Sequence, residues 1–143
     1  MSLYVTDAGI AVKWFLAEMH SDKARQLLEQ FQQRAIELIA PEMLVAESAN
    51  VFWKRVERGD ITAQEAAANL QDLLAINLPL VPSTSLAAGA LALAQTHHRS
   101  VYDSLYLALA LERGCDLVTS DERLFNAVSS HFPQITLLRD LTL

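Results

Sequence analysis

The order of its segments constrains the fold of this 143-residue chain most strongly. Short apolar, β-prone runs alternate with longer segments in which apolar residues recur every three to four positions. Strands separated by helices pair in parallel, because each helix carries the chain back to the edge where the previous strand began. The pattern therefore predicts an α/β fold, a three-layer α/β/α sandwich with a central, mainly parallel sheet. The expected strands are Leu3–Thr6, Leu38–Ala40, Leu78–Val81, Leu117–Thr119 and Ile135–Leu138.

Polar residues and glycines mark the ends of the helices between these strands. Thr62 followed by Glu65 has the pattern of a capping box, in which each side chain accepts a hydrogen bond from a backbone amide of the first turn. Gly59 and Gly114 are placed to end the helices before them. Five of the expected helices are Ile10–Leu16, Met43–Arg58, Thr62–Ile76, Asp103–Arg113 and Asp121–Val128. A sixth is capped by Ser21-Asp22 and has Ala24, Leu27, Leu28 and Phe31 on one face. A seventh is capped by Ser83–Ser85 and ends at His97.

The composition indicates a single domain, residues 1–143, with a substantial core. Apolar residues make up 52% of the chain and charged residues 20%, a balance that argues against disorder. No repeat, linker or low-complexity tract suggests a second domain. The net charge of −6 argues against a general cationic nucleic-acid binder, although it does not exclude a nuclease.

Several absences restrict where the protein is expected to act. The single cysteine, Cys115, cannot form an intramolecular disulfide. The N-terminus lacks a basic segment, and Asp7 interrupts its apolar run, so no signal peptide is expected. The longest apolar runs, Leu86–Ala94 and Leu105–Leu111, are far shorter than the ~20 residues that cross a bilayer. We therefore expect a cytoplasmic protein without a membrane partner.

Two acidic residues directly follow expected strands. Asp7 comes after Leu3–Thr6, and Asp121 follows Leu117–Thr119 with one residue between. Ligands of open α/β sheets bind beyond the carboxyl ends of the strands, so both acids are expected at the functional edge. Each could instead do no more than cap the next helix, since Asp is among the preferred capping residues.

Two further acids lie on expected helices. Glu47 is three residues after Leu44 and four before Val51, which places it on or beside an apolar stripe. An unpaired buried carboxylate costs several kcal/mol, so such groups are paired, protonated or metal-bound. Glu47 could instead extend to solvent or pair with Lys54, Arg55 or Arg58, and Asn50 is its natural neighbour. Asp103 begins a helix that is apolar nearly all round, where the helix dipole alone would favour an acid.

Taken together, these four acids favour a metal site. They can converge above one sheet edge, and carboxylates brought together require a cation to offset their repulsion. Ligation by oxygen alone is typical of Mg²⁺ or Mn²⁺, whereas no pair of the four histidines has the spacing expected for Zn²⁺. Lys13, Arg99 and Arg123 flank the acidic blocks, where each is either a phosphate contact or an ordinary solvated charge. Phosphate-loop, dinucleotide-binding, serine-hydrolase and HExxH motifs are all absent.

Four sequence blocks together resemble a known family. They are the strand end at Asp7-Ala8 with Ala11–Phe15 after it, the block Pro41–Asn50, the block Tyr102–Ala110, and the block Leu117–Leu124. In this order and spacing the chain resembles the PIN-domain family, and more narrowly the VapC-type ribonuclease toxins of type II VapBC toxin–antitoxin systems. The resemblance covers essentially the whole chain.

The resemblance implies an endoribonuclease that depends on Mg²⁺ or Mn²⁺ and leaves 5′-phosphate and 3′-hydroxyl ends on RNA. Asp7, Glu47, Asp103 and Asp121 match the four acids that hold the metal in this family. The implied partners are an RNA substrate and a cognate antitoxin protein, with a homodimer and a toxin–antitoxin hetero-oligomer as implied assemblies. Many relatives carry a small hydroxyl residue two positions after the first acid, where this chain has Gly9.

Two other functions remain open. One is a catalytically silent PIN-like module that binds RNA or protein, which retention of all four acids argues against. The other is a receiver-like phosphoacceptor domain. That class normally has adjacent acids after its first strand and a late strand-end lysine, and this chain has neither.

Overall fold

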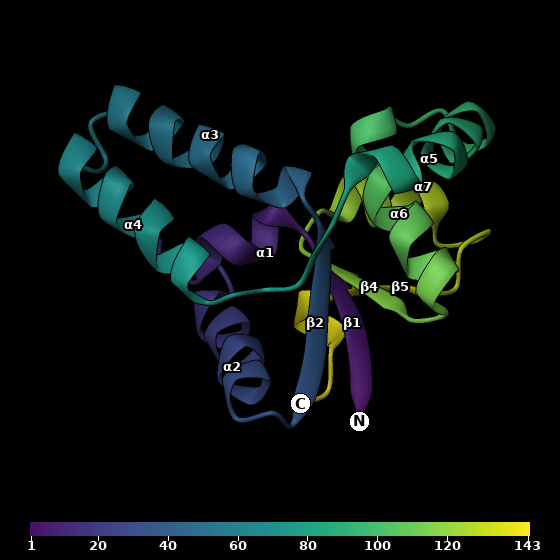
Figure 1. Ribbon diagram of the computed structural model, residues 1–143, viewed down its shortest axis with the longest axis horizontal. Helices are drawn as coiled ribbons and strands as arrows, with labels where there is room; N and C mark the ends of the chain where they lie inside the picture. The colour runs from purple at the N-terminus through teal and green to yellow at the C-terminus, as the bar shows by residue number, and fades with distance from the viewer.

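The computed structural model describes residues 1–143 and contains five strands and seven α-helices in the expected alternation (Figure 1). The strands are β1 (Ser2–Thr6), β2 (Ile36–Pro41), β3 (Leu80–Val81), β4 (Asp116–Thr119) and β5 (Ile135–Leu137). The helices are α1 (Ala8–Lys13), α2 (Ser21–Gln32), α3 (Met43–Glu57), α4 (Ala63–Ala75), α5 (Ser83–His97), α6 (Val101–Arg113) and α7 (Glu122–Val128), and a 3-10 turn, η1 (Leu138–Asp140), follows β5.

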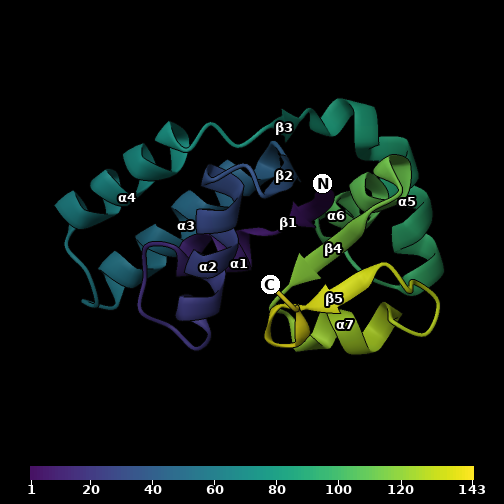
Figure 2. The ribbon, with the colours of Figure 1, turned by 90° about the horizontal axis from the view of Figure 1, so that it is seen from below.

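The five strands form one parallel sheet in the order β3-β2-β1-β4-β5. The connections from β1 to β2 and from β2 to β3 run in one direction across the sheet, and those that lead to β4 and β5 run in the other. Since such crossovers are right-handed, the two sets of helices cover opposite faces. Figures 1 and 2 show α1 to α4 on one side of the sheet and α5 to α7 on the other. The three-layer α/β/α fold is confirmed.

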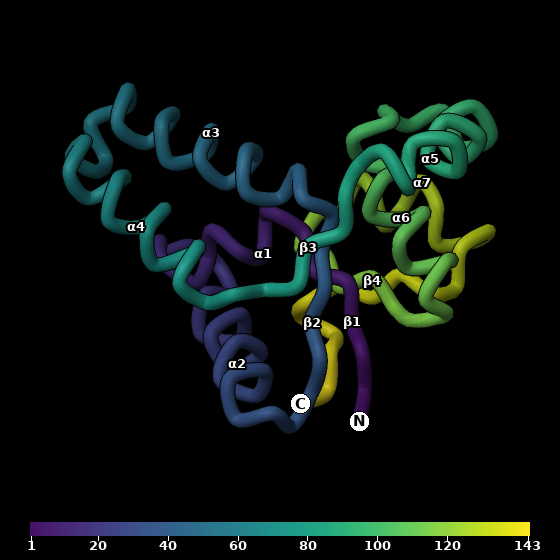
Figure 3. The backbone as a smooth tube through the Cα atoms, in the orientation of Figure 1, coloured from purple at the N-terminus to yellow at the C-terminus, as the bar shows by residue number.

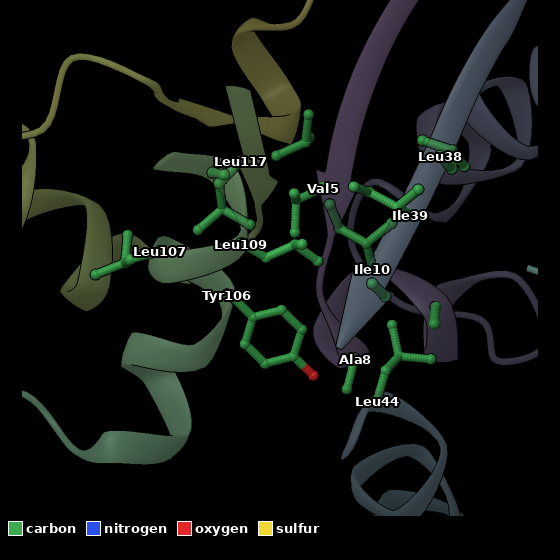
Figure 4. Close-up of a cluster of buried hydrophobic side chains, with 14 of the residues drawn as sticks. Val5, Ala8, Ile10, Leu38, Ile39, Leu44, Tyr106, Leu107, Leu109 and Leu117 are labelled. Atoms are coloured by element: carbon green, nitrogen blue, oxygen red, sulfur yellow. The ribbon is translucent and has the colours of Figure 1, made fainter. Parts of the chain in front are cut away.

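The core lies where α6 packs against the middle strands. Val5 of β1 and Leu117 of β4 are fully buried next to Leu109 of α6, and Leu38 of β2 is fully buried on the opposite face of the sheet (Figure 4). This explains why the α6 sequence is apolar nearly all round, since residues 104–110 are all buried. This packing of α6 on the sheet also fixes where the first turn of α6 lies relative to the strand ends.

The helix ends follow the sequence in part. The capping box of α4 is present, with Thr62 and Glu65 each accepting a backbone N–H, and Gly59 and Gly114 both have positive φ. Three other helix caps differ from expectation. Ser21 does not cap α2, because its hydroxyl accepts from the Glu18 amide and donates to the Leu16 carbonyl, and α5 begins after Pro82 without a side-chain cap. Helix α6 starts two residues before Asp103, with the Ser100 hydroxyl as its cap.

The strand order creates a crevice at one edge of the sheet. Strands β1 and β4 are neighbours although more than 100 residues separate them, and the chain leaves their carboxyl ends in opposite directions (Figure 3). Ligands of open α/β sheets bind at such a reversal of strand order. No helix has the length and apolar character needed to span a membrane.

Candidate active site

Thr119 joins the two acids that follow the central strands. The register pairs Thr6 with Val118, which brings Asp7 level with Thr119. The Thr119 hydroxyl donates to Oδ2 of Asp7 and accepts from the Asp121 backbone N–H, 3.0 Å away. Oδ1 of Asp7 also accepts from the Ile10 amide at 2.9 Å, and Oδ1 of Asp121 from the Leu124 amide at 3.1 Å. Both acids therefore cap helices, as the sequence allows, while each keeps oxygen lone pairs for another ligand.

Glu47 is held by a tyrosine rather than by a base. The Tyr106 hydroxyl of α6 donates to Oε1 of Glu47 at 2.7 Å, which bridges helices on opposite faces of the sheet. Figure 4 shows the Tyr106 ring at the edge of the core, with its oxygen pointing toward Ala8 and Leu44. None of the expected partners, Lys54, Arg55, Arg58 or Asn50, bonds to Glu47. Asn50 is exposed, and Arg55 pairs with Glu18 and Asp60.

Asp103 is paired with the one arginine that touches the four acids. It lies in the first turn of α6, where Nη2 of Arg99 is 3.4 Å from its Oδ2. Nε of Arg99 is buried and has no hydrogen-bond partner. Arg99 therefore partly neutralises Asp103 and retains donor capacity.

All four predicted acids line a single pocket of about 130 Å³. They arrive from four different places in the chain: the ends of β1 and β4, the second turn of α3 and the start of α6. Tyr106, Gly9 and Ser120 complete the polar part of the wall. The expected convergence at one sheet edge is observed, although a role of these acids as metal ligands stays a prediction.

Burial and the charges of neighbouring acids raise the pKa values of Asp7 and Glu47. The pKa of Asp7 is raised to about 6, chiefly by burial and further by the charges of Asp121 and Glu47, against the opposing hydrogen bonds from Thr119 and Ile10. The pKa of Glu47 is raised as well, first by burial and then by the charge of Asp103, while the Tyr106 hydroxyl lowers it. The pocket thus concentrates negative charge that a bound cation would stabilise.

The donor set suits a hard divalent cation. It consists of carboxylates and hydroxyls, with no thiolate or imidazole in the wall, and Mg²⁺ and Mn²⁺ prefer oxygen ligands. In this conformation no three Asp, Glu, His or Cys side chains anywhere in the chain are grouped so that they could hold an ion together. The chemistry of the pocket therefore fits such a cation, while its geometry is not that of a preformed site.

Sequence reasoning missed the residues that hold the acids. Tyr106 reads as one apolar position of a buried helix, and Thr119 as an ordinary β-branched strand residue. Ser120 lies next to Gly9: a Cβ on Gly9 would be 3.2 Å from the Ser120 hydroxyl and 3.4 Å from Oδ1 of Asp7. The Ser120 hydroxyl thus lies where a side chain at position 9 would point. Strand register determines these proximities, and no local motif signals them.

Comparison with known proteins identifies the family of this chain. The family model described as the PIN domain matches residues 4–130, which is most of the chain. The chain belongs to the PIN-domain family. Among curated proteins, this PIN domain is 32% identical over 122 residues to Ribonuclease VapC3 of Pyrobaculum aerophilum, a match that covers 84% of this chain and 90% of that protein.

Solved structures support the same PIN fold. The crystal structure of PAE2754 from Pyrobaculum aerophilum matches with a TM-score of 0.70 and 22% identity, over 96% of this chain and 85% of that one. A toxin–antitoxin complex from Klebsiella pneumoniae matches with a TM-score of 0.64 and 17% identity, over 99% and 100% of the two chains. At these identities the two likenesses establish the fold of the PIN domain.

Proposed function

We propose that this PIN domain is a divalent-metal-dependent endoribonuclease, with Asp7, Glu47, Asp103 and Asp121 as its catalytic metal ligands. The observation that carries the proposal is that these four carboxylates, from four separate segments, line one pocket at the reversal of strand order. The 32% identity to a protein named a ribonuclease supports RNA as the substrate. A bound Mg²⁺ or Mn²⁺ would supply the Lewis acidity that activates water and stabilises the leaving oxygen of a phosphodiester.

Neighbouring side chains hold three of the four acids of the pocket in place. Thr119 holds the Asp7 carboxylate next to the start of α7, and Tyr106 restrains one oxygen of Glu47. Arg99 occupies one oxygen of Asp103, so we expect the Asp103 side chain to turn away from Arg99 when the pocket is loaded. The freed guanidinium is then available to a phosphate of the substrate.

We further propose that the protein is the toxin of a type II toxin–antitoxin pair, restrained by a cognate antitoxin. Two similarities support this assignment: the relative named VapC3 and the fold match to a toxin–antitoxin complex. A homodimer remains a prediction from the family resemblance. Size-exclusion chromatography with light scattering of the protein alone tests the homodimer, and co-expression with a small reading frame found directly upstream of the gene tests the antitoxin complex.

Metal-dependent cleavage of single-stranded RNA tests the enzymatic proposal. Antitoxin-free protein should cleave a mixed RNA pool with Mg²⁺ or Mn²⁺ and not with EDTA, and Asp7→Asn should lower the rate at least 100-fold. The matched control is Asp116→Asn, which removes the same charge from the exposed, opposite end of β4 and should cleave at the wild-type rate.

The same assay decides between the nuclease and a catalytically silent PIN-like module that binds RNA or protein. If the metal-loaded wild type leaves varied RNAs intact at protein concentrations that bind them, the silent module is favoured. Cleavage that is equal in the wild type and Asp7→Asn would point to a contaminating nuclease and contradict our assignment of the pocket.

A further inference from the structure

A second and larger cavity lies directly beside the acidic pocket. It has a volume of about 310 Å³, and Ser120 lines both spaces. Its floor comes from the end of β5 and the start of η1, through Leu137 and Leu138, and Met19 and His20 of the α1–α2 loop form another side. Figure 2 shows α7 beside β5 at this part of the sheet. Because Ser120 is shared, a ligand in the cavity would be next to one in the acidic pocket.

The chemistry of this cavity differs from that of its acidic neighbour. Three apolar side chains line the cavity: Met19 is exposed, whereas Leu137 and Leu138 are almost fully buried, so Met19 provides most of the apolar surface open to a flat ring. Lys13 and Arg139 provide positive charge, and Glu122 is the single acid of the wall. The cavity therefore combines an apolar surface with cationic groups, in a chain whose net charge is −6.

Lys13 is the most unusual residue of the wall, because it is only 8% exposed. Its ammonium donates to the Met19 carbonyl at 2.8 Å and to Oε1 of Glu18 at 3.4 Å. An ammonium has three N–H donors, so one remains for a ligand. Glu18 is also bound by Arg55 of α3, so the loop that carries Met19 is tied to two helices and the wall is largely preformed.

Arg139 is held at the opposite side of the wall. Its Nη1 donates to Glu122 at 2.5 Å, and its carbonyl accepts from the Lys23 ammonium at 2.8 Å. The guanidinium also lies 3.9 Å from Asp140, and with five N–H donors it keeps several for another acceptor. The cationic groups can bind a phosphate, and the exposed Met19 side chain gives an attached base an apolar surface.

We propose that this cavity binds one unpaired nucleotide of the RNA strand, next to the phosphodiester at the acidic pocket. The inference rests on the proposed nuclease function and deepens it, since it names the part of the protein that selects the cleavage position. The base packs against the exposed Met19 side chain, and a phosphate oxygen accepts from Lys13 or Arg139. A volume near 300 Å³ is at the lower end of ligand pockets, which suits one nucleotide and not a folded RNA element.

Nucleotide titration followed by NMR tests the site without requiring catalysis. ¹⁵N-labelled, metal-free protein in EDTA is titrated with AMP, GMP, CMP and UMP, and separately with inorganic phosphate. At least one nucleotide should shift the backbone amides of His20, Ser120 and Arg139 in a saturable way, at lower concentrations than phosphate alone. Arg139→Gln should raise the Kd of that nucleotide at least fivefold. Arg113→Gln is the matched control, because Arg113 is exposed at the opposite end of the sheet.

The outcomes separate this inference from the proposed function. Amide shifts confined to the acidic pocket, or none with any nucleotide, would overturn the nucleotide site even if the protein cleaves RNA. Saturable shifts in the cavity without metal-dependent cleavage would support the nucleotide site and contradict the nuclease. Shifts produced equally by phosphate would reduce the cavity to an anion site and overturn the role given to Met19.

Discussion

Asp7 is the residue in which folding stability and the proposed chemistry conflict most directly. Its carboxylate is partly buried beside two other acids, and its pKa is raised to about 6. Because the folded state then binds the proton more tightly than the unfolded chain, the metal-free protein should lose stability as pH rises from about 4 through 6. Two hydrogen bonds to the carboxylate reduce this loss without removing it.

Asp7→Asn should therefore stabilise the metal-free protein above pH 6. From a pKa of 3.8 in the unfolded chain to about 6 in the fold, the difference corresponds to at most about 3 kcal/mol at pH 7.5 and to almost nothing at pH 4. Urea denaturation in EDTA at both pH values measures it, with Asp116→Asn as the control. A stability difference that does not change with pH would contradict this account of Asp7.

Tyr106 contributes to stability through one hydrogen bond from its hydroxyl. The residue is 4% exposed, and its hydroxyl donates to Glu47 at 2.7 Å. Tyr106→Phe should lower the free energy of unfolding by about 1.5 kcal/mol, because the bond joins a charged acceptor. It should also raise the metal concentration that gives half-maximal cleavage, since the lost bond lets the pKa of Glu47 rise further. Tyr102→Phe, on the same helix and 67% exposed, should change neither quantity.

At the scale of helices and strands, one glycine within α5 and one at the end of α6 show how backbone conformation decides whether an added side chain stabilises the fold. Gly114 ends α6 at φ +61, and a Cβ at this position would meet no atom within 4 Å. Gly89 is helical within α5, and a Cβ there would meet Ala108 at an ordinary 3.8 Å. Left-handed backbone costs an L-residue roughly 1–2 kcal/mol, while alanine inside a helix is favoured over glycine by about 1 kcal/mol.

The same substitution at these two glycines should therefore have opposite effects. Gly114→Ala should destabilise the protein by about 1 kcal/mol, and Gly89→Ala should stabilise it by up to about 1 kcal/mol. Urea denaturation of both variants measures the pair. Equal effects would mean that contacts, rather than backbone conformation, dominate at these positions.

At the scale of the whole molecule, the acidic pocket couples ligand binding to folding. The four carboxylates come together only in the folded chain, because α3, α6 and two strand ends must all be in place. A cation that binds there stabilises the fold by mass action, by about 2.7 kcal/mol at 100 times its Kd. Mn²⁺ or Mg²⁺ should therefore raise the melting temperature by several degrees.

Asp103→Asn is the informative variant for that measurement. It removes one proposed ligand and should reduce the metal-dependent rise to less than half that of the wild type, as followed by differential scanning fluorimetry. Asp72→Asn, an exposed acid on α4, serves as the control and should respond as the wild type does. Unchanged melting curves for the wild type at saturating Mn²⁺ would argue against a metal site in this pocket.

Local sequence patterns determined the elements of this protein. Alternating apolar runs and helical periodicity predicted every strand and helix within a few residues, and the capping box of α4 is confirmed. The placement of Asp7 and Asp121 after strands predicted their convergence, because carboxyl ends of parallel strands share one edge of a sheet. Such features depend on residues close together in the chain, so a sequence contains them directly.

Tertiary structure alone decided what those residues touch. Thr119 reaches Asp7 and Tyr106 reaches Glu47 across separations of 112 and 59 residues, and both contacts depend on strand order and on the depth at which α6 packs. Ser21 reads as a helix cap, yet its hydroxyl is used within the preceding loop. The cavity beside the pocket likewise combines residues of the α1–α2 loop with β5 and η1. Side-chain partners follow from the packing of distant segments, and local propensity does not encode that packing.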